Sequence, residues 1–282
     1  MSFVEKYDVF LLDCDGVIWT GKDAVPGAAD VITKLMALNK RVMFVTNNST
    51  KTRQILVDQI QSVLGISGIS GDVCYSSGIA TARFLKDKLQ EGEKVFIIGS
   101  EGFSQVMTEN GIEYIGLGLD IEPINFKEFG NFKPDPSIKY VVGGFDPYFN
   151  HTKMTKAFIY IREGGAKYIA TNLDIVYPLS KDRLLPGTGS VLAGLNHALG
   201  TLPTVIGKPS SVFFDVISKD HGITDKSRVL MVGDNLLTDI QFGCNSGIDT
   251  ALVMTGVTTK EMLSEPGAKP TYIMDSMVGL LD

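Results

Sequence analysis

The stretch FLLDCDGVIW, residues 10–19, places two aspartates one residue apart at the end of an apolar run. The run that includes it, YDVFLLD at 7–13, is typical of a strand that is buried on both faces. Positions two apart in a strand share a face, so Asp13 and Asp15 are expected to point into one cleft, with Asp15 already in the turn. A solvated turn is the simple interpretation, and a metal site that handles phosphate is the functional one.

The chemistry of adjacent carboxylates favours the metal site. Two carboxylates this close repel each other, and each raises the pKa of the other. A divalent cation relieves that repulsion, and Mg²⁺ prefers one or two carboxylates together with water and phosphate oxygens. Gly16 lets the backbone bend so that successive N–H groups point at an anion. Trp19 is expected to pack beside this site as part of a flap.

Apolar strands alternate with helical patterns in the first 64 residues. RVMFVTNN at 41–48 is a second buried strand, and helical patterns begin at Pro26-Gly27 and span 50–64. The same alternation returns later, with apolar strands expected within 203–209, 227–235 and 250–256. This order predicts an α/β fold with a doubly wound, Rossmann-like parallel sheet. In such sheets the site lies beyond the carboxyl ends of the strands.

A second α/β unit is expected between these two halves. Three more apolar strands lie within 94–100, 138–144 and 167–172, and helical patterns span 101–110 and 152–163. The polar stretch at 125–137 is expected to be a loop. We therefore predict a core domain of residues 1–79 and 181–282, interrupted by a smaller inserted cap domain of residues 80–180. A cap of this kind would close over a substrate.

Polar residues also follow the second strand, at Thr46-Asn47-Asn48-Ser49. The Thr46 hydroxyl and the backbone N–H groups of Asn47 and Asn48 are candidate phosphate ligands. The alternative is that Asn or Ser at this position caps the following helix. This segment alone favours the capping interpretation.

Two later segments add charged groups at predicted strand ends. Lys208, stiffened by the proline that follows it, would offset the charge of carboxylates and phosphate, although GKP is also common in loops. Asp234 ends the strand VLMV and supplies a third carboxylate. Asp239 lies five residues further on, either beside the same site or at a helix N-terminus, where an acid is favoured.

Composition excludes several classes of partner. The formal net charge is -6, which disfavours nucleic acid as a partner. No apolar run approaches the roughly 20 residues of a membrane span, and the N-terminal residues lack a signal-peptide layout. The three cysteines are scattered, as expected of reduced thiols in a cytoplasmic protein. The expected partner is a small molecule.

Taken together, the segments FLLDCDGVIW, VTNNS, GKP and GDNLLTD resemble the four motifs of the haloacid dehalogenase superfamily. VPGA at 25–28 and ATNLDIVYPLSKDRLLPGTGSV at 170–191 resemble the nitrophenylphosphatase-like branch, which has a large α/β cap and includes phosphoglycolate and pyridoxal phosphate phosphatases. The resemblance covers nearly the whole chain. The sequence departs from some relatives at residues 235–237, which are often more polar.

The resemblance implies a role for each matching residue. Asp13 would attack phosphorus and form an aspartyl-phosphate. Asp15 would protonate the leaving alcohol and then deprotonate the attacking water. Mg²⁺ would be held by the Asp13 carboxylate, the backbone carbonyl of Asp15 and Asp234, with Asp239 tied to a metal-bound water or to Lys208. Thr46, Asn47 and Lys208 would bind the transferring phosphoryl group.

The function implied by the resemblance is a Mg²⁺-dependent phosphomonoesterase acting on small phosphorylated metabolites. Phosphoglycolate and pyridoxal phosphate are candidate natural substrates, and p-nitrophenyl phosphate is an artificial one. Asn172 and Asp174 in the cap loop would hydrogen-bond the leaving group, or else form a capped turn. Caps of this branch often form dimers, so a homodimer through the cap stays an option. A phosphotransferase or mutase, and a binding regulator without turnover, are the alternatives.

Overall fold

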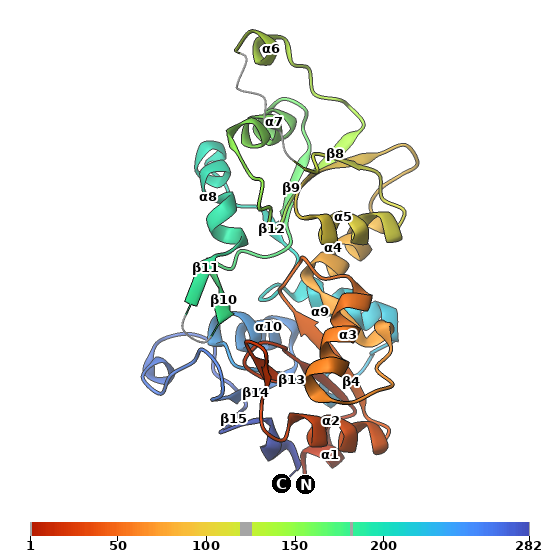
Figure 1. Ribbon diagram of the computed structural model, residues 1–282, viewed down its shortest axis with the longest axis vertical. Coiled ribbons are helices and arrows are strands. Elements are labelled where there is room, and N and C mark those ends of the chain that lie inside the picture. Colours follow the sequence, from red (N-terminus) through yellow and green to blue (C-terminus); the bar gives the residue numbers. More distant parts are fainter. Residues whose placement is uncertain (1, 119–125, 181–182, 282) are drawn as a thin grey trace.

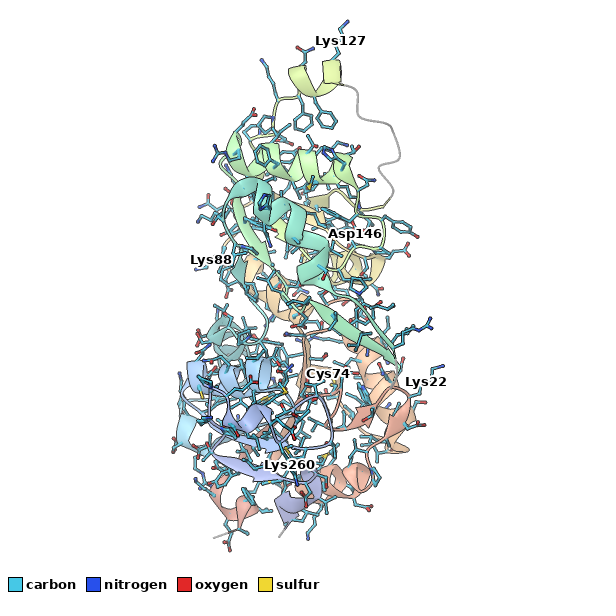
Figure 2. The ribbon with its side chains drawn as sticks, turned by 90° about the vertical axis from the view of Figure 1, so that its left-hand side faces the viewer. Lys22, Cys74, Lys88, Lys127, Asp146 and Lys260 are labelled. Carbon is cyan, nitrogen blue, oxygen red and sulfur yellow. The ribbon has the colours of Figure 1, made fainter. Side chains whose placement is uncertain are left out.

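The molecule is elongated and contains two parallel β-sheets, placed one beyond the other along its long axis (Figure 1). The computed structural model describes residues 2–118, 126–180 and 183–281. We call the part built on the six-stranded sheet the core module and the part built on the five-stranded sheet the cap module. Both chain ends lie at the far end of the core module (Figure 1). Asp146 lies in the cap module and Lys260 in the core module (Figure 2).

The core module is the expected doubly wound sheet. Its six strands are all parallel, in the order β15-β14-β13-β1-β4-β5. The strands are β1 (Val9–Leu12), β4 (Arg41–Thr46), β5 (Cys74–Ser76), β13 (Val229–Gly233), β14 (Asp249–Val253) and β15 (Tyr272–Met274). The accompanying helices are α1 (Phe3–Lys6), α2 (Ala28–Ala37), α3 (Arg53–Leu64), α9 (Ser211–His221) and α10 (Gln241–Ser246).

Alternation of side chains explains why β1 is apolar throughout. Val9 and Leu11 belong to the buried cluster that contains residues of α9, whereas Phe10 and Leu12 belong to the cluster that contains residues of α2 and α3. Successive side chains of a strand point to opposite faces, so a strand covered on both faces needs an unbroken apolar run.

The direction of winding reverses at β1. From β1 the chain continues to β4 and β5 on one side, whereas β13, β14 and β15 lie on the other. Leu12, the last residue of β1, is in register with Phe44 of β4 and Val232 of β13. A doubly wound sheet binds its ligand in the crevice at this point of reversal, beyond the carboxyl ends of the strands. The residues that follow β1, β4 and β13 therefore define the candidate site.

The cap module has a parallel sheet of its own, in the order β12-β9-β8-β6-β7. Its strands are β6 (Lys94–Ile98), β7 (Tyr114–Ile115), β8 (Ile138–Gly143), β9 (Lys167–Ala170) and β12 (Thr204–Val205). Its helices are α4 (Ser77–Lys86), α5 (Glu101–Glu109), α6 (Phe126–Asn131), α7 (His151–Arg162) and α8 (Thr188–Leu199). The three strands and two helices predicted for this region are therefore present.

Two sequence expectations for this region differ from the structure. Within the loop expected at 125–137, residues 126–131 form α6, which the polar composition of the stretch did not indicate. The expected strand at 203–209 is β12, but it pairs with β9 of the cap sheet and not with the core sheet. The domain boundaries at residues 79/80 and 180/181 stay a prediction, since strand pairing alone does not define a domain.

Two short antiparallel hairpins flank the junction of the modules. The β2–β3 hairpin, of Trp19–Thr20 and Asp23–Ala24, follows the DCDG turn directly. The β10–β11 hairpin, of Val176–Ser180 and Arg183–Pro186, extends from the cap module toward the core module on the side where Lys22 lies (Figure 2).

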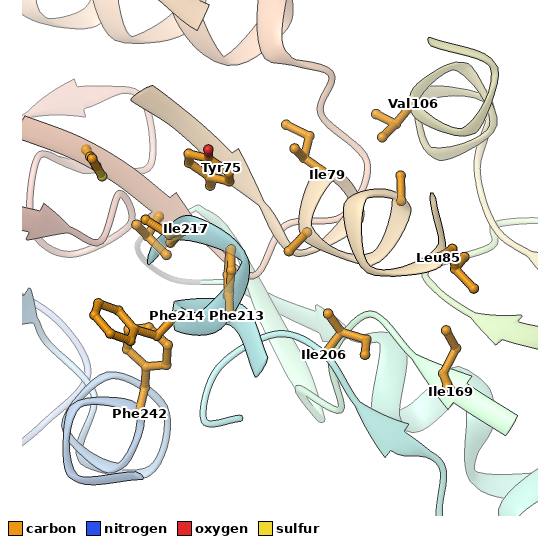
Figure 3. Close-up of a cluster of buried hydrophobic side chains, with 14 of the residues drawn as sticks. Tyr75, Ile79, Leu85, Val106, Ile169, Ile206, Phe213, Phe214, Ile217 and Phe242 are labelled. Carbon is orange, nitrogen blue, oxygen red and sulfur yellow. The ribbon is translucent and has the colours of Figure 1, made fainter. Parts of the chain in front are cut away.

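One buried apolar cluster continues from the core module into the cap module. It joins Phe213 and Phe214 of α9 to Ile79 and Leu85 of α4 and to Ile169 of β9 (Figure 3). Burial of apolar surface is the main favourable term in folding, so this shared cluster is expected to stabilise the junction of the modules. The site beside that junction then depends on packing in both modules.

We predict that Phe213→Ala lowers the free energy of unfolding by about 3–5 kcal/mol, because the ring is fully buried and its removal leaves a cavity. The change is measured by urea unfolding followed by circular dichroism. Leu202→Ala is the matched control, since Leu202 is 69% exposed and its truncation should change the same quantity by less than about 0.5 kcal/mol. Equal effects of the two substitutions would contradict the assignment of Phe213 to the core.

Candidate active site

Three aspartates from the ends of two neighbouring strands form a buried cluster. Asp13 follows β1, and its backbone N–H donates to the Val232 carbonyl of β13 at 2.9 Å. Asp234 follows β13, and Asp239 lies in a π-helical turn, η3 (Leu236–Ile240). One carboxylate oxygen from each aspartate lies within 4.8 Å of the other two, and all three residues are buried. The sheet thus brings Asp13 together with two acids that lie more than 200 residues further along the chain.

Backbone groups hold Asp234 and Asp239 in orientation. The Val257 N–H donates to Asp234 Oδ2 at 2.7 Å, and the Asp234 N–H donates to Asp239 Oδ2 at 3.2 Å. Two glycines allow these close approaches. A Cβ at Gly256 would lie 1.7 Å from Asp234 Oδ2, and one at Gly233 would lie 2.1 Å from Asp239 Cβ. Any side chain at either glycine would displace a carboxylate.

Lys208 supplies positive charge to this cluster. Its Nζ lies 2.6 Å from Asp13 Oδ1 and 2.7 Å from Asp239 Oδ1, and donates to the Val45 carbonyl at 3.0 Å. The side chain comes from the loop after β12, so it reaches the core site from the edge of the cap sheet. Three carboxylates and one ammonium leave an excess of two negative charges when all four groups are ionised.

Burial and this excess charge shift the pKa values of the cluster. Burial raises the pKa of Asp13 well above its usual range; Lys208 opposes the shift, and Asp239 and Asp234 add to it. Burial, followed by repulsion from Asp239, raises the pKa of Asp234 to about 7. Burial by itself would lower the pKa of Lys208, but the Asp13 and Asp239 carboxylates raise it. A further cation at the cluster would favour the ionised carboxylates.

The side chain of Asp15 lies outside the three-carboxylate cluster. Its Oδ1 accepts a hydrogen bond from Trp19 Nε1 at 2.9 Å, and Asp15 forms a β-bridge with Trp19. Trp19 is fully buried and belongs to the β2–β3 hairpin, beside Asp15 as expected, and a flap role for it stays a prediction. The metal role expected for Asp15 runs through its backbone carbonyl and stays a prediction.

Asn47 connects the core site to both chain segments that lead into the cap module. Its side-chain amide accepts from the Lys208 N–H at 2.9 Å and donates to the Lys208 carbonyl at 3.0 Å and to Asp174 Oδ1 at 3.2 Å. Its backbone carbonyl accepts from Ser77 Oγ at 2.7 Å and from Asn172 Nδ2 at 2.8 Å. The side-chain amide of Asn47 therefore holds the backbone of Lys208, whereas the expected phosphate contact of this segment is through backbone N–H groups. Burial raises the pKa of Asp174.

The polar segment after β4 forms a local turn before α3. Thr46 Oγ1 accepts from the Asn48 N–H at 3.1 Å, and Asn48 Oδ1 accepts from the Thr50 N–H at 3.1 Å. The N-cap of α3 is Thr52, whose hydroxyl accepts from the Ile55 N–H at 3.3 Å. The capping role considered for Asn47 to Ser49 is thus filled further along the chain.

The structure brings most of the predicted site residues together. Asn172 Oδ1 accepts from the Asp174 N–H at 3.1 Å, in keeping with the capped-turn alternative for that loop. The indole contact to Asp15 and the role of Asn47 in holding Lys208 were not predicted. The only sign of the indole contact in the sequence was the position of Trp19, four residues after Asp15. No feature of the sequence near Asn47 indicated its bonds to Lys208.

Among the described residues, no helix combines the length and the apolar character needed to cross a membrane.

Comparisons with known proteins agree with this geometry. Residues 10–113 match the family model of haloacid dehalogenase-like hydrolases, and residues 205–280 match a HAD-hydrolase-like model. Phosphoglycolate phosphatase 2 of Arabidopsis thaliana is 36% identical, over 99% of this chain and 94% of the relative.

Solved structures of two phosphatases share the fold. A 4-nitrophenylphosphatase from Thermotoga maritima is 32% identical, with a TM-score of 0.81 over 100% of this chain and 98% of its own. A glycerol phosphate phosphatase from Mycobacterium tuberculosis, solved in complex with magnesium, is 27% identical, with a TM-score of 0.82 over 99% of this chain and 78% of its own. With these motifs, this fold and full-length similarity, the chain belongs to the haloacid dehalogenase-like hydrolases and is a phosphatase of that family.

Proposed function

We propose that this phosphatase hydrolyses phosphate monoesters of small metabolites, that it requires Mg²⁺, and that it works through an aspartyl-phosphate on Asp13. The observation that carries the proposal is the buried cluster of Asp13, Asp234 and Asp239, with the Lys208 ammonium ion-paired with two of its carboxylates. Buried charges are retained where they are paired or coordinate a metal, and one ammonium does not balance three carboxylates.

The donor set fits Mg²⁺. The available ligands are carboxylate oxygens, which a hard cation prefers, and the excess negative charge of the cluster is what a divalent cation would neutralise. Asp13, Asp234 and the Asp15 carbonyl would hold the ion, and Asp239 would support the site through Lys208. When bound, the ion would neutralise charge on the phosphoryl group and orient it.

The residues of the chain would divide the reaction into two displacements. In the first, an Asp13 carboxylate oxygen bonds to phosphorus, the bond from phosphorus to the leaving oxygen breaks, and Asp15 gives its proton to that oxygen. In the second, water attacks phosphorus, Asp15 takes a proton from the water, and the bond to Asp13 breaks. Lys208 would stabilise charge on the phosphoryl oxygens, with Thr46 and the backbone of Asn47 and Asn48 as further ligands.

The substrate class follows from the cap and from the relatives. A cap module beside the site favours small substrates over macromolecules. Phosphoglycolate and pyridoxal phosphate remain candidates, glycerol phosphate joins them through a structural relative, and p-nitrophenyl phosphate is the assay substrate. Substrate contact by Asn172 and Asp174 stays a prediction, and their bonds to Asn47 support a positioning role.

We also propose a cellular compartment for the protein. Cys14 and Cys74 are buried free thiols, which supports a reducing compartment such as the cytoplasm. A homodimer through the cap module stays a prediction.

Replacing the proposed nucleophile tests the reaction directly. We expect Asp13→Asn to lower kcat/KM for p-nitrophenyl phosphate by about a thousandfold or more, because the amide cannot form the covalent intermediate. Asp30→Asn, at an exposed position of α2, is the matched control and should keep wild-type turnover. Turnover of Asp13→Asn within tenfold of wild type would rule out the assignment, and product analysis with added alcohol separates hydrolysis from phosphate transfer.

The raised pKa of Asp234 predicts a pH-dependent affinity for Mg²⁺. Binding requires the carboxylate, so below the pKa of about 7 the ion must displace a proton. Isothermal titration of metal-free protein should show the dissociation constant rising by about tenfold or more per pH unit below about pH 7, because Asp13, whose pKa is also raised, must be ionised as well. Asp234→Asn should weaken binding and flatten this dependence. Equal wild-type affinities at about pH 6 and pH 8 would contradict the role of Asp234.

A further inference from the structure

The indole of Trp19 is bonded to one oxygen of the proposed general acid. Trp19 Nε1 donates to Asp15 Oδ1 at 2.9 Å, and the tryptophan is fully buried whereas Asp15 is partly exposed. The reaction proposed above needs Asp15 to present a proton to the leaving oxygen. That reaction does not require the other oxygen of the carboxyl group to accept a hydrogen bond from a buried indole N–H, so this contact needs a separate explanation.

The position of the indole is held from several directions. The backbone N–H of Trp19 donates to the Cys14 carbonyl at 3.2 Å, and the backbone carbonyl of Trp19 accepts from the Gly16 N–H at 2.7 Å. Lys51 Nζ lies 5.3 Å from the centre of the indole ring, within the range of a cation–π interaction. The indole is therefore fixed by the same turn that carries Asp15 and by the loop before α3.

The chemistry of indole decides which carboxyl oxygen can carry the proton. An indole N–H donates a hydrogen bond and cannot accept one. In a protonated carboxyl group the carbonyl oxygen is the stronger acceptor, so a hydrogen bond from Trp19 to Oδ1 favours the form of Asp15 that carries its proton on Oδ2. We propose that Trp19 is a positioning residue for catalysis: its N–H makes Oδ2 the proton-donating oxygen of Asp15 and restricts rotation of the carboxyl group. This inference rests on the proposed role of Asp15 as the general acid.

A positioning role of this kind has a kinetic signature. Departure of an alkoxide depends strongly on protonation, whereas p-nitrophenolate is a stable anion and leaves without it. Loss of the indole N–H should therefore reduce kcat/KM for alkyl phosphates much more than for p-nitrophenyl phosphate. A purely structural role of Trp19 would instead reduce kcat/KM for all substrates by a similar factor.

The test compares kcat/KM across p-nitrophenyl, phenyl and glycerol phosphates at saturating Mg²⁺. Trp19→Phe removes the N–H, and replacement of Trp19 by benzothienylalanine removes it while keeping the shape of the ring. The chain contains a single tryptophan, so its replacement alters no other indole. Thr20→Ala, in the same hairpin and exposed, is the matched control. Circular dichroism melting identifies any variant that is not folded, and the isosteric replacement then decides.

We expect the isosteric replacement to lower kcat/KM for glycerol phosphate by about 10- to 100-fold and for p-nitrophenyl phosphate by less than about threefold. Thr20→Ala should match wild type on all three substrates. A uniform loss across the substrates, or no loss, in the isosteric replacement would overturn the inference.

Asp15→Asn separates failure of the inference from failure of the proposed function. If Asp15 is the general acid, this variant should lose kcat/KM for glycerol phosphate by about 10²- to 10⁴-fold, with a much smaller loss for p-nitrophenyl phosphate. A loss that is uniform across substrates in Asp15→Asn would overturn the general-acid role and the inference with it. A selective loss in Asp15→Asn, without one in the Trp19 replacements, would overturn the inference alone.

Discussion

The arrangement of the site depends on the contact of one buried ammonium with two buried carboxylates. Lys208 Nζ lies between Asp13 at the end of β1 and Asp239 after β13, where negative charge would otherwise be uncompensated. Removing a charge from water is costly unless it is paired, so the position of this lysine is a strong constraint. Lys208 follows β12, a strand of the cap sheet, and the pairing of charges in the core therefore fixes the edge of the cap sheet beside it.

Asn47 adds a second constraint, because it fixes the backbone of Lys208 as well. Its side-chain amide bonds both backbone groups of Lys208, which lies in the segment that returns from the cap sheet to the core. Its backbone carbonyl accepts from Ser77, in the segment that enters the cap module, and from Asn172 in the cap loop after β9. Buried amide groups of this kind are favourable only when their partners are present in the right geometry. The second polar motif thus joins the two modules beside the candidate active site.

The two aspartates of the DCDG turn have different surroundings, and this difference gives them different chemistry. Asp13 lies in the buried cluster beside Lys208, where it is suited to metal binding and nucleophilic attack. Asp15 lies outside that cluster and bonds to the indole of Trp19. Only Cys14 separates the two residues in the sequence, but the hairpin that follows the turn places the indole of Trp19 against Asp15, so their environments differ. A carboxyl group outside the proposed metal site would be free to exchange protons with substrate and water.

Local patterns in the sequence determined the architecture and the chemical class of the site. The unbroken apolar runs at 9–12, 42–45 and 229–233 require strands covered on both faces, and the polar residue after each run marks the edge of the sheet where ligands are expected to bind. Only the tertiary structure decided that β12 joins the cap sheet, that Asn47 holds Lys208 and that Trp19 bonds to Asp15. The first two of these contacts join residues more than 30 positions apart. The contact of Trp19 with Asp15 requires the β2–β3 hairpin, whose two-residue strands are too short to be predicted from the sequence pattern. Periodicity and propensity describe near neighbours along the chain, whereas these partners are chosen by packing and by the need to satisfy buried polar groups.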